Sequence, residues 1–252
     1  MDTIAPVPFS STRAYVLEAR YEFLRLLRTP SFSLPCLLFP PVFYLLFGVL
    51  LGGKGGPAVA QYMLAGYGVF GVIGVALFGF GVTVAMDREQ GLLTLKRAQP
   101  MPPGAYLVAK MAMALLFAAI ILVLLATLAA GVAGVQLSTA QWIAWALTCL
   151  VGVLPFSALG LWLGTLVSGR GAPALINLIY LPMAFLSGLW VPLTMLPPVL
   201  QTTAPVWPAY HLAHIAQQAV GVGEGRPLGL HVAVLAAITA VFFVLARRRL
   251  VH

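Results

Sequence analysis

The sequence has few charged residues and even fewer acidic ones. Aspartate, glutamate, lysine and arginine together make up 8% of its 252 residues, whereas a soluble protein carries about 25%. Acidic residues number 6 against 14 Lys and Arg, so the formal net charge is +8. So few charges could not keep a chain with 61% hydrophobic residues soluble as a monomer. The composition therefore excludes a soluble enzyme, a disordered protein and a coiled coil, and indicates a chain that lies in lipid.

Cysteine is also scarce. Cys36 and Cys149 both lie within apolar runs. They form neither the spacing of a metal site nor a disulfide framework. We interpret both as small buried hydrophobic residues.

Long apolar runs separated by charged residues make up most of the sequence. A helix needs roughly 20 apolar residues to cross a bilayer. The uncharged stretch 111–169 is long enough for two spans, and a turn signal at 131–141 divides it. We therefore expect a single transmembrane domain over residues 1–252. Its six transmembrane helices are expected at about residues 32–51, 61–86, 109–130, 142–167, 171–191 and between Arg226 and Arg247.

The basic residues lie almost entirely on one side of the membrane in this arrangement. Twelve of the 14 Lys and Arg fall on the side of the two termini, and only Lys54 and Arg226 fall on the other. Cytoplasmic loops are enriched in Lys and Arg, so both termini are predicted to be cytoplasmic. The positive charge then marks membrane orientation, and we expect no nucleic-acid partner.

Residues 12–28 predict an amphipathic helix that lies on the membrane surface. Apolar side chains share one arc of this helix, Glu22 and Arg25 lie on the opposite side, and Arg20 and Arg28 flank it. Two interpretations are open: a simple membrane anchor, or an elbow that also touches a cytoplasmic partner. The predicted fold class is thus an all-α polytopic membrane protein with an interfacial elbow helix and six spans.

Two glycine motifs match nucleotide-binding patterns but lack their context. Gly48 to Lys54 resembles a Walker A loop without the following Ser or Thr, and Gly66 to Gly71 matches G-x-G-x-x-G inside an apolar run. Close packing of helices explains such glycines better, including the Gly160/Gly164 pair.

His211 and His214 lie one helical turn apart without further metal ligands nearby. We interpret them as interfacial polar residues. The alternative, an intramembrane acid–base enzyme, lacks the paired carboxylates or the nucleophile that such chemistry needs.

The expected spans contain no ionisable residue near the membrane centre. Ion-coupled carriers and proton pumps usually keep such residues there. His231, near the outer start of the last span, is the one histidine within the spans. Energy for transport would therefore come from outside the membrane domain, and a separate ATPase subunit is the natural source.

The second cytoplasmic connection, residues 87–104, carries the clearest signal. Acidic residues at its start and basic residues later suit the dipole of a short helix. Leucines give this helix an apolar strip, and prolines end it. Two interpretations remain: a solvated hairpin, or a docking element whose leucines fill a groove of a partner while the charges fix its register.

Two motifs resemble a known family. The first reads Asp87-Arg88-Glu89-Gln90-Gly91-Leu92-Leu93, followed by Pro100 and Lys110. The second runs from Phe185-Leu186-Ser187-Gly188 through a Pro- and Leu-rich segment to Tyr210-His211. The chain resembles, over nearly its whole length, the permease subunits of type-2 ATP-binding-cassette (ABC) exporters.

The resemblance implies a homodimer or heterodimer of six-span permeases in the plasma (inner) membrane, in contact with lipid and with two cytoplasmic ATP-binding subunits. ATP and magnesium would bind those partners, and this chain would hold no cofactor. Residues 193–226 would form an outer segment with half-helices. The implied coupling helix consists of Asp87, Arg88, Glu89, Gln90, Gly91, Leu92, Leu93, Leu95, Lys96 and Arg97.

Spans two and five would line the translocation route in this family. The candidate lining residues are Tyr67, Phe70, Phe78, Asn177, Tyr180 and Phe185, with Asn177 expected as a buried hydrogen-bonding group. Their aromatic character suggests ATP-driven export of an amphipathic or lipid-linked substrate. A membrane scaffold or assembly factor remains the rival function.

Overall fold

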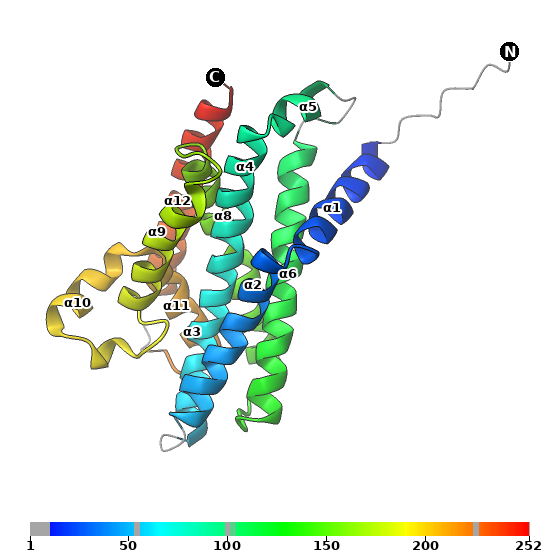
Figure 1. Ribbon diagram of the computed structural model, residues 1–252. Coiled ribbons are helices and arrows are strands. Elements are labelled where there is room, and N and C mark those ends of the chain that lie inside the picture. Colours follow the sequence, from blue (N-terminus) through cyan, green and yellow to red (C-terminus); the bar gives the residue numbers. More distant parts are fainter. Residues whose placement is uncertain (1–10, 53–55, 99–101, 103, 224–226, 252) are drawn as a thin grey trace, which may run out of the picture.

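The computed structural model describes residues 11–52, 56–98, 102, 104–223 and 227–251 (Figure 1). These residues form helices and connecting turns, with no strand among them. The longest helical runs are α2 (Pro30–Phe43) with the π-helix η1 (Tyr44–Leu50), α3 (Gly56–Ala76) with the π-helix η3 (Leu77–Val82) and α4 (Thr83–Glu89), α6 (Ala105–Gly131), α7 (Thr139–Val151) with α8 (Val153–Gly164), and α12 (Leu228–Val251). The shorter elements are α1 (Ser11–Leu27), α5 (Leu92–Ala98), α9 (Ala172–Leu186), η4 (Leu193–Met195), α10 (Pro198–Thr203), η5 (Ala204–Val206) and α11 (Pro208–Ala219).

The expected spans correspond to these helices. Among the described residues, 5 helices are long and apolar enough to cross a membrane. The remaining expected span is α9, which has 15 residues and is shorter than the roughly 20 that a bilayer needs. The all-helical, polytopic class is confirmed, whereas the count of six spans stays a prediction.

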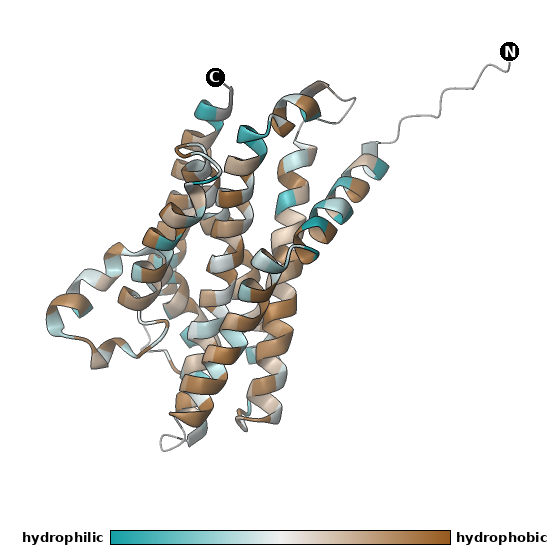
Figure 2. Cartoon of the chain, viewed as in Figure 1, coloured by the Kyte–Doolittle hydropathy of each residue, from teal (hydrophilic) through white to brown (hydrophobic). Residues whose placement is uncertain are grey.

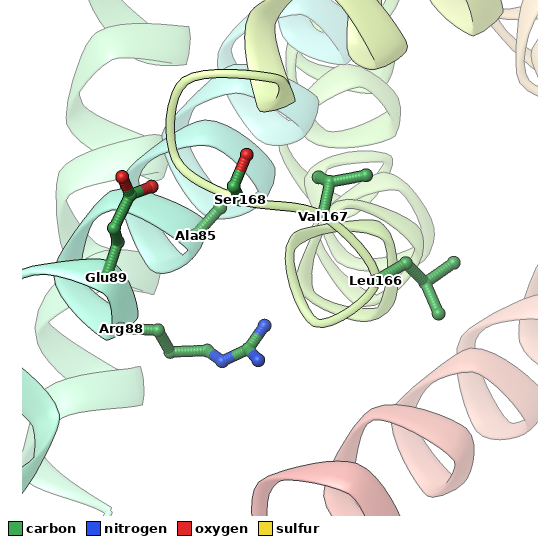
Figure 3. A pocket seen from close by; sticks show the side chains of 6 residues that line it. All are labelled: Ala85, Arg88, Glu89, Leu166, Val167 and Ser168. Carbon is green, nitrogen blue, oxygen red and sulfur yellow. The ribbon is translucent and has the colours of Figure 1, made fainter.

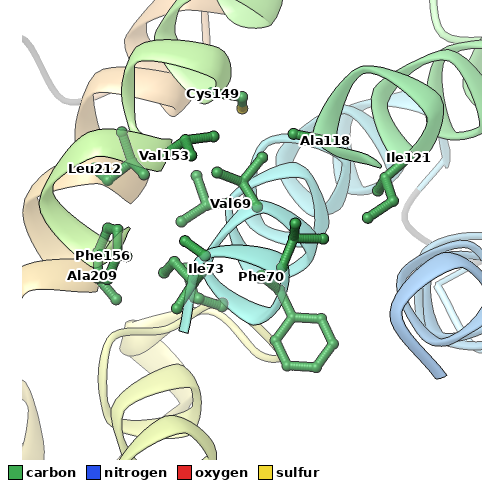
Figure 4. Close-up of a cluster of buried hydrophobic side chains, with 14 of the residues drawn as sticks. Val69, Phe70, Ile73, Ala118, Ile121, Cys149, Val153, Phe156, Ala209 and Leu212 are labelled. Atoms are coloured by element: carbon green, nitrogen blue, oxygen red, sulfur yellow. The ribbon is translucent and has the colours of Figure 1, made fainter. Parts of the chain in front are cut away.

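Helix α3 lies at the centre of the bundle. In the span Gly56–Glu89, which contains α3, 89% of the most apolar window is buried, against 11% in the span Leu228–Arg249 of α12. Figure 4 shows Val69, Phe70 and Ile73 of α3 surrounded by side chains from four other helices. Those neighbours are Ala118 and Ile121 of α6, Cys149 of α7, Val153 and Phe156 of α8, and Ala209 and Leu212 of α11.

Two glycines of α8 allow its backbone to touch the second span. A Cβ atom on Gly164 would lie 2.5 Å from the carbonyl oxygen of Gly81, and one on Gly160 would lie 3.1 Å from that of Ala76. Any larger side chain would force the two backbones apart. The interpretation of this pair as a close-packing motif is confirmed.

The polar side chains gather at one end of the bundle. Figure 2 shows hydrophilic residues on α1, at the end of α4 and at the end of α12, and predominantly hydrophobic residues along the rest of the long helices. The start of α1, helix α5 and the end of α12 all lie at this end (Figure 1). We refer to it as the polar end.

The segment expected to form outer half-helices contains η4, α10, η5 and α11. Helix α11 packs between α3, α7 and α12. Side-chain amides of Gln61 and Gln141 both donate to the carbonyl oxygen of Val220, directly after α11. Protein groups therefore satisfy a carbonyl at this helix end, where lipid could not.

Candidate functional site

Five side chains from three helices form an ionic cluster at the polar end. We use the term ionic cluster for Glu22 and Arg25 of α1, Asp87 of α4, and Tyr106 and Lys110 of α6. Lys110 Nζ lies 2.7 Å from Glu22 Oε1 and 3.0 Å from Asp87 Oδ2. Arg25 contacts the same two carboxylates, with 2.9 Å from Nη2 to Glu22 Oε1 and 3.0 Å from Nη1 to Asp87 Oδ1. Tyr106 donates its hydroxyl proton to Asp87 Oδ2 over 2.7 Å.

The centre of the ionic cluster is closed to solvent. The Lys110 side chain is 0% exposed, those of Glu22 and Asp87 are each 4% exposed, and that of Arg25 is 40% exposed. Two carboxylates face two cations, so the formal charges balance. Such balance is required because an unpaired ion in an apolar interior is strongly unfavourable.

Lys110 uses its full donor capacity. An ammonium group has three N–H donors. Besides the two carboxylates, Lys110 Nζ donates to Thr83 Oγ1 over 2.6 Å. Thr83 in turn donates to the carbonyl oxygen of Gly79 within the π-helix η3. The cluster is thereby joined to the irregular turn of the second span, and π-helical turns occur frequently at functional sites.

Arg25 connects the cluster to water. Burial lowers the pKa of its guanidinium, but the hydrogen bond that it donates to Asp87 and the charges of Glu22 and Asp87 outweigh that effect, so the pKa is raised overall. Arg25 therefore stays a cation at every physiological pH. It balances the second carboxylate of the cluster, which Lys110 alone could not neutralise.

Helix α5 is attached to the cluster through Lys96. The ammonium group of Lys96 pairs with Glu18 of α1. The same group lies 5.1 Å from the centre of the Tyr106 ring, and Lys110 Nζ lies 4.9 Å from that centre. Burial and the charge of Lys110 lower the pKa of Lys96. One tyrosine ring thus separates the cation of α5 from the buried cation of α6.

Helix α4 also contacts the connection that follows α8. Arg88 Nη1 donates to the carbonyl oxygen of Gly164 over 2.9 Å, and the Gly169 amide donates to Glu89. A pocket of about 340 Å³ lies between these segments (Figure 3). Its walls are formed by Ala85, Arg88, Glu89, Leu166, Val167 and Ser168.

The segment 87–97, expected to form a single coupling helix, is divided in the structure. Its first three residues, Asp87 to Glu89, end α4. Gln90 and Gly91 form a turn in which Gly91 has φ +73°, a left-handed conformation that favours glycine. Helix α5 then carries Leu92, Leu93, Leu95 and Lys96; the Arg97 side chain lies outside the described residues.

Two expectations about exposure in these segments are wrong. Asp87 is 3% exposed and contacts α1 and α6, so it is not available to a docking partner. Glu22 was expected on the polar, outward side of the elbow helix, but it is 5% exposed and faces Lys110. Arg20 and Arg28 are exposed as expected. Asp87 and Glu22 are buried because their carboxylates pair with the buried Lys110, which outweighs their tendency to face water.

The candidate route residues do not share one surface. Tyr67, Phe70 and Tyr180 are buried, with the Phe70 and Tyr180 rings stacked at 4.9 Å. These three pack the interior of the chain, and Phe78 is half-buried beside Tyr180. Asn177 and Phe185 are exposed on α9, so the expectation of a buried Asn177 is wrong for the single chain.

Sequence reasoning missed the ionic cluster because its members are far apart in the chain. Glu22 and Lys110 are separated by 88 positions. Lys110 was expected at the start of the third span, among the basic residues on the side of the termini, and the structure places it buried in the second turn of α6. A lysine followed by an uncharged run and preceded by prolines gave no indication of burial. The available signal was the pair of acidic residues, Glu22 and Asp87, next to otherwise basic segments.

Comparison with known proteins adds an independent finding. The sequence model of a family described as ABC-2 type transporter matches residues 14–220. This range contains the whole ionic cluster, α5 and α11. The chain is also similar to the "Putative transport permease YvfS" of Bacillus subtilis (strain 168), with 27% identity over 228 residues, which cover 90% of this chain and 92% of that protein.

Proposed function

The chain belongs to the ABC-2 type transporter family, and on that premise we propose that it exports an amphipathic or lipid-linked substrate with ATP hydrolysed by a separate subunit. It is a multi-pass membrane permease subunit of an ABC transporter rather than a catalytic enzyme.

The observation that carries the proposal is the connection from α5 to the transmembrane helices. Helix α5 is short, lies at the polar end and exposes Leu95 to 57%. The ion pair of Lys96 connects α5 to α1, and the turn at Gly91 joins it to α4. Two cytoplasmic ATP-binding subunits would dock on this element of two permease copies, with Leu95 entering a groove of the partner.

The ionic cluster would transmit a displacement of α5 to the membrane-spanning helices. It holds α1, α4 and α6 together through a buried lysine with three hydrogen-bond acceptors. Because these contacts are closed to water, they resist separation more than surface ion pairs do. The three helices would therefore move as one unit. The contact between Arg88 and Gly164 would transmit that movement to α8.

The charge distribution supports a cytoplasmic location of the polar end. The N-terminal helix α1 carries arginines, α5 and the end of α12 carry further basic residues, and all three lie at that end. Lys and Arg are retained on the cytoplasmic side of membrane proteins. Both termini would then be cytoplasmic, in the plasma (inner) membrane, with α1 as the interfacial elbow.

A second permease copy would cover part of α9. Asn177 is exposed there beside Leu178, which is 71% exposed. An amide facing hydrocarbon lacks a hydrogen-bond partner, and interhelical contacts between membrane helices commonly supply one. Two copies related by a two-fold axis through this face would place Asn177 and Phe185 next to the substrate route.

The docking contact can be tested by co-purification. Leu95→Glu would place a charge in the proposed groove contact, so the variant should lose its ATPase partner while its yield stays normal. Met195→Glu is the matched control, because Met195 is an exposed apolar residue, 75% accessible, in the distant element η4. Retention of the ATPase by Leu95→Glu, or equal loss with both variants, would contradict the proposed docking element and favour a scaffold.

A further inference from the structure

Three histidines from two helices meet within the buried part of the chain, away from the ionic cluster. His211 and His214 belong to α11, and His231 belongs to α12. Their side chains pack with their ring centres 5.1 Å apart for His211 and His231 and 5.3 Å apart for His214 and His231. The Tyr210 ring closes the group at 4.2 Å from His214. None of the three histidines is more than 8% exposed.

The contacts of His211 fix where its proton resides. Its Nε2 lies 3.0 Å from the carbonyl oxygen of Pro205. A carbonyl can only accept, so Nε2 must carry a proton. In the neutral ring Nδ1 is then the acceptor. Since Nδ1 of His211 lies 2.8 Å from Nδ1 of His231, the neutral His231 ring must carry its proton on Nδ1.

This pair can hold one additional proton but not two. If His211 becomes a cation, its Nδ1 donates and His231 must shift its own proton to Nε2. If both rings are cations, two N–H groups face each other at hydrogen-bond distance with no acceptor between them. Two positive charges at that separation repel strongly in a buried site. The doubly protonated pair must therefore separate.

The described elements that pack against α11 carry no negative charge. Helix α11 packs against α3, α7, α9, α12 and η5, and none of these elements contains Asp or Glu. Their titratable groups are the tyrosines of α3 and α9, the Cys149 thiol, Tyr210 and His214 of α11 itself, and the arginines at the far end of α12. Glu224 and Arg226, in the connection from α11 to α12, lie outside the described residues.

We propose that His211 and His231 form a proton-sensitive clasp that holds α11 against α12 and releases when both rings are protonated. The clasp is independent of the proposed docking of an ATPase, because it lies on other helices and needs no partner chain. Acidification on the side of α11 would loosen this helix from α12.

The direction of the pH effect follows from linkage. Burial lowers the pKa of His211 below its ordinary value of 6.5, although the hydrogen bond to Pro205 acts in the opposite sense. The folded state therefore binds protons less readily than the unfolded state. The stabilisation is fully present above pH 6.5 and is lost as the pH falls below that value.

The test uses the full chain in lipid nanodiscs and measures its thermal unfolding midpoint between pH 7.5 and 5.0. The wild-type midpoint should fall reversibly by several degrees over this range. In His231→Gln the amide can donate to Nδ1 of His211 or accept from it, so the fall should be less than half as large. His252→Gln replaces the histidine at the last position of the sequence and should behave as wild type. Equal falls in wild type and His231→Gln would overturn the proposal.

A second measurement needs no variant. Spectra of the chain with ¹⁵N-labelled histidine distinguish Nδ1–H from Nε2–H tautomers. At pH 7.5 we expect one ring protonated on Nδ1 and assigned to His231, and another protonated on Nε2 and assigned to His211. Two neutral Nε2–H rings at these positions, titrating independently, would show that the clasp does not exist.

Discussion

The ammonium group of Lys110 lies 2.7 Å from the carboxylate of Glu22 and joins helix α6 to the amphipathic helix α1 across 88 positions of sequence. The pair is accessible to almost no solvent, so neither residue can be removed without leaving a buried charge. This relationship makes α1 part of the bundle rather than a separate surface helix.

Replacement of Lys110 by methionine should strongly destabilise the chain. The variant leaves two buried carboxylates against one arginine, and loss of one partner of a buried pair costs about 3–5 kcal/mol. The thermal unfolding midpoint in nanodiscs should fall accordingly. Arg20→Met, at an exposed position of helix α1, is the control and should change the midpoint little.

The double variant Lys110→Met with Glu22→Gln should be more stable than Lys110→Met alone. Removing one carboxylate restores the charge balance with Arg25 and Asp87. If the second substitution instead lowers the midpoint by its full separate effect, the two residues do not interact, and the ionic cluster does not exist as described.

Exchange of the charges of Glu18 and Lys96 should test the connection between α1 and α5. Both side chains are partly exposed, 20% and 23%, so the pair contributes at most about 1 kcal/mol to stability. Glu18→Lys or Lys96→Glu alone should reduce substrate-stimulated ATP hydrolysis in the reconstituted complex. The double exchange should recover it. No recovery would indicate that Glu18 and Lys96 each act through the ATPase subunit and not through their mutual contact.

Substitution of Gly164 by alanine should weaken the contact between α8 and the second span. The added carbon would lie 2.5 Å from the Gly81 carbonyl oxygen, and neither backbone can yield without shifting a helix. Overpacking of this kind costs about 1–3 kcal/mol. Gly131→Ala serves as the control because no atom lies within 4 Å of its added carbon. Size-exclusion profiles of fluorescent fusions should show loss of monodisperse protein for Gly164→Ala alone.

The orientation can be measured with single cysteines in a background of Cys36→Ser and Cys149→Ala. Thr94→Cys on α5 and Thr202→Cys on α10 both occupy exposed positions. A membrane-impermeant maleimide should label Thr202→Cys in intact cells and Thr94→Cys only in inverted vesicles. The reverse pattern would place the polar end outside and contradict the positive-inside assignment.

The sequence was sufficient to predict elements whose signal is local. Uncharged runs of about 20 residues mark long helices because such runs can be satisfied only in lipid or in a core. The Gly160/Gly164 pair likewise predicts close packing from spacing alone. The break at Gly91 was missed, since one glycine among leucines gives no indication that a turn divides the segment.

The ionic cluster could not be predicted because its energetics depend on the tertiary arrangement. Glu22 lies among arginines on an amphipathic helix, and this pattern predicts a side chain that faces water. It is buried only because α6 places Lys110 opposite it. In the same way, His211 and His214 gave no indication of His231, which follows 20 positions after His211. The exposure of Asn177 depends on which helices cover α9, which no sequence pattern reveals.

The central position of α3 has a consequence for how the chain is made. This helix is synthesised as the second span, yet some of its partners, such as α11, are synthesised much later. The hydroxyl of Tyr67 is directed at the carbonyl of Trp190, 123 residues further on, and Gly66 packs against Leu189. During translation α3 must therefore lie in lipid, or beside an insertion factor, with part of its eventual contact surface uncovered. We expect truncated chains that end before α11 to retain α3 in the membrane but to remain bound to the insertion machinery.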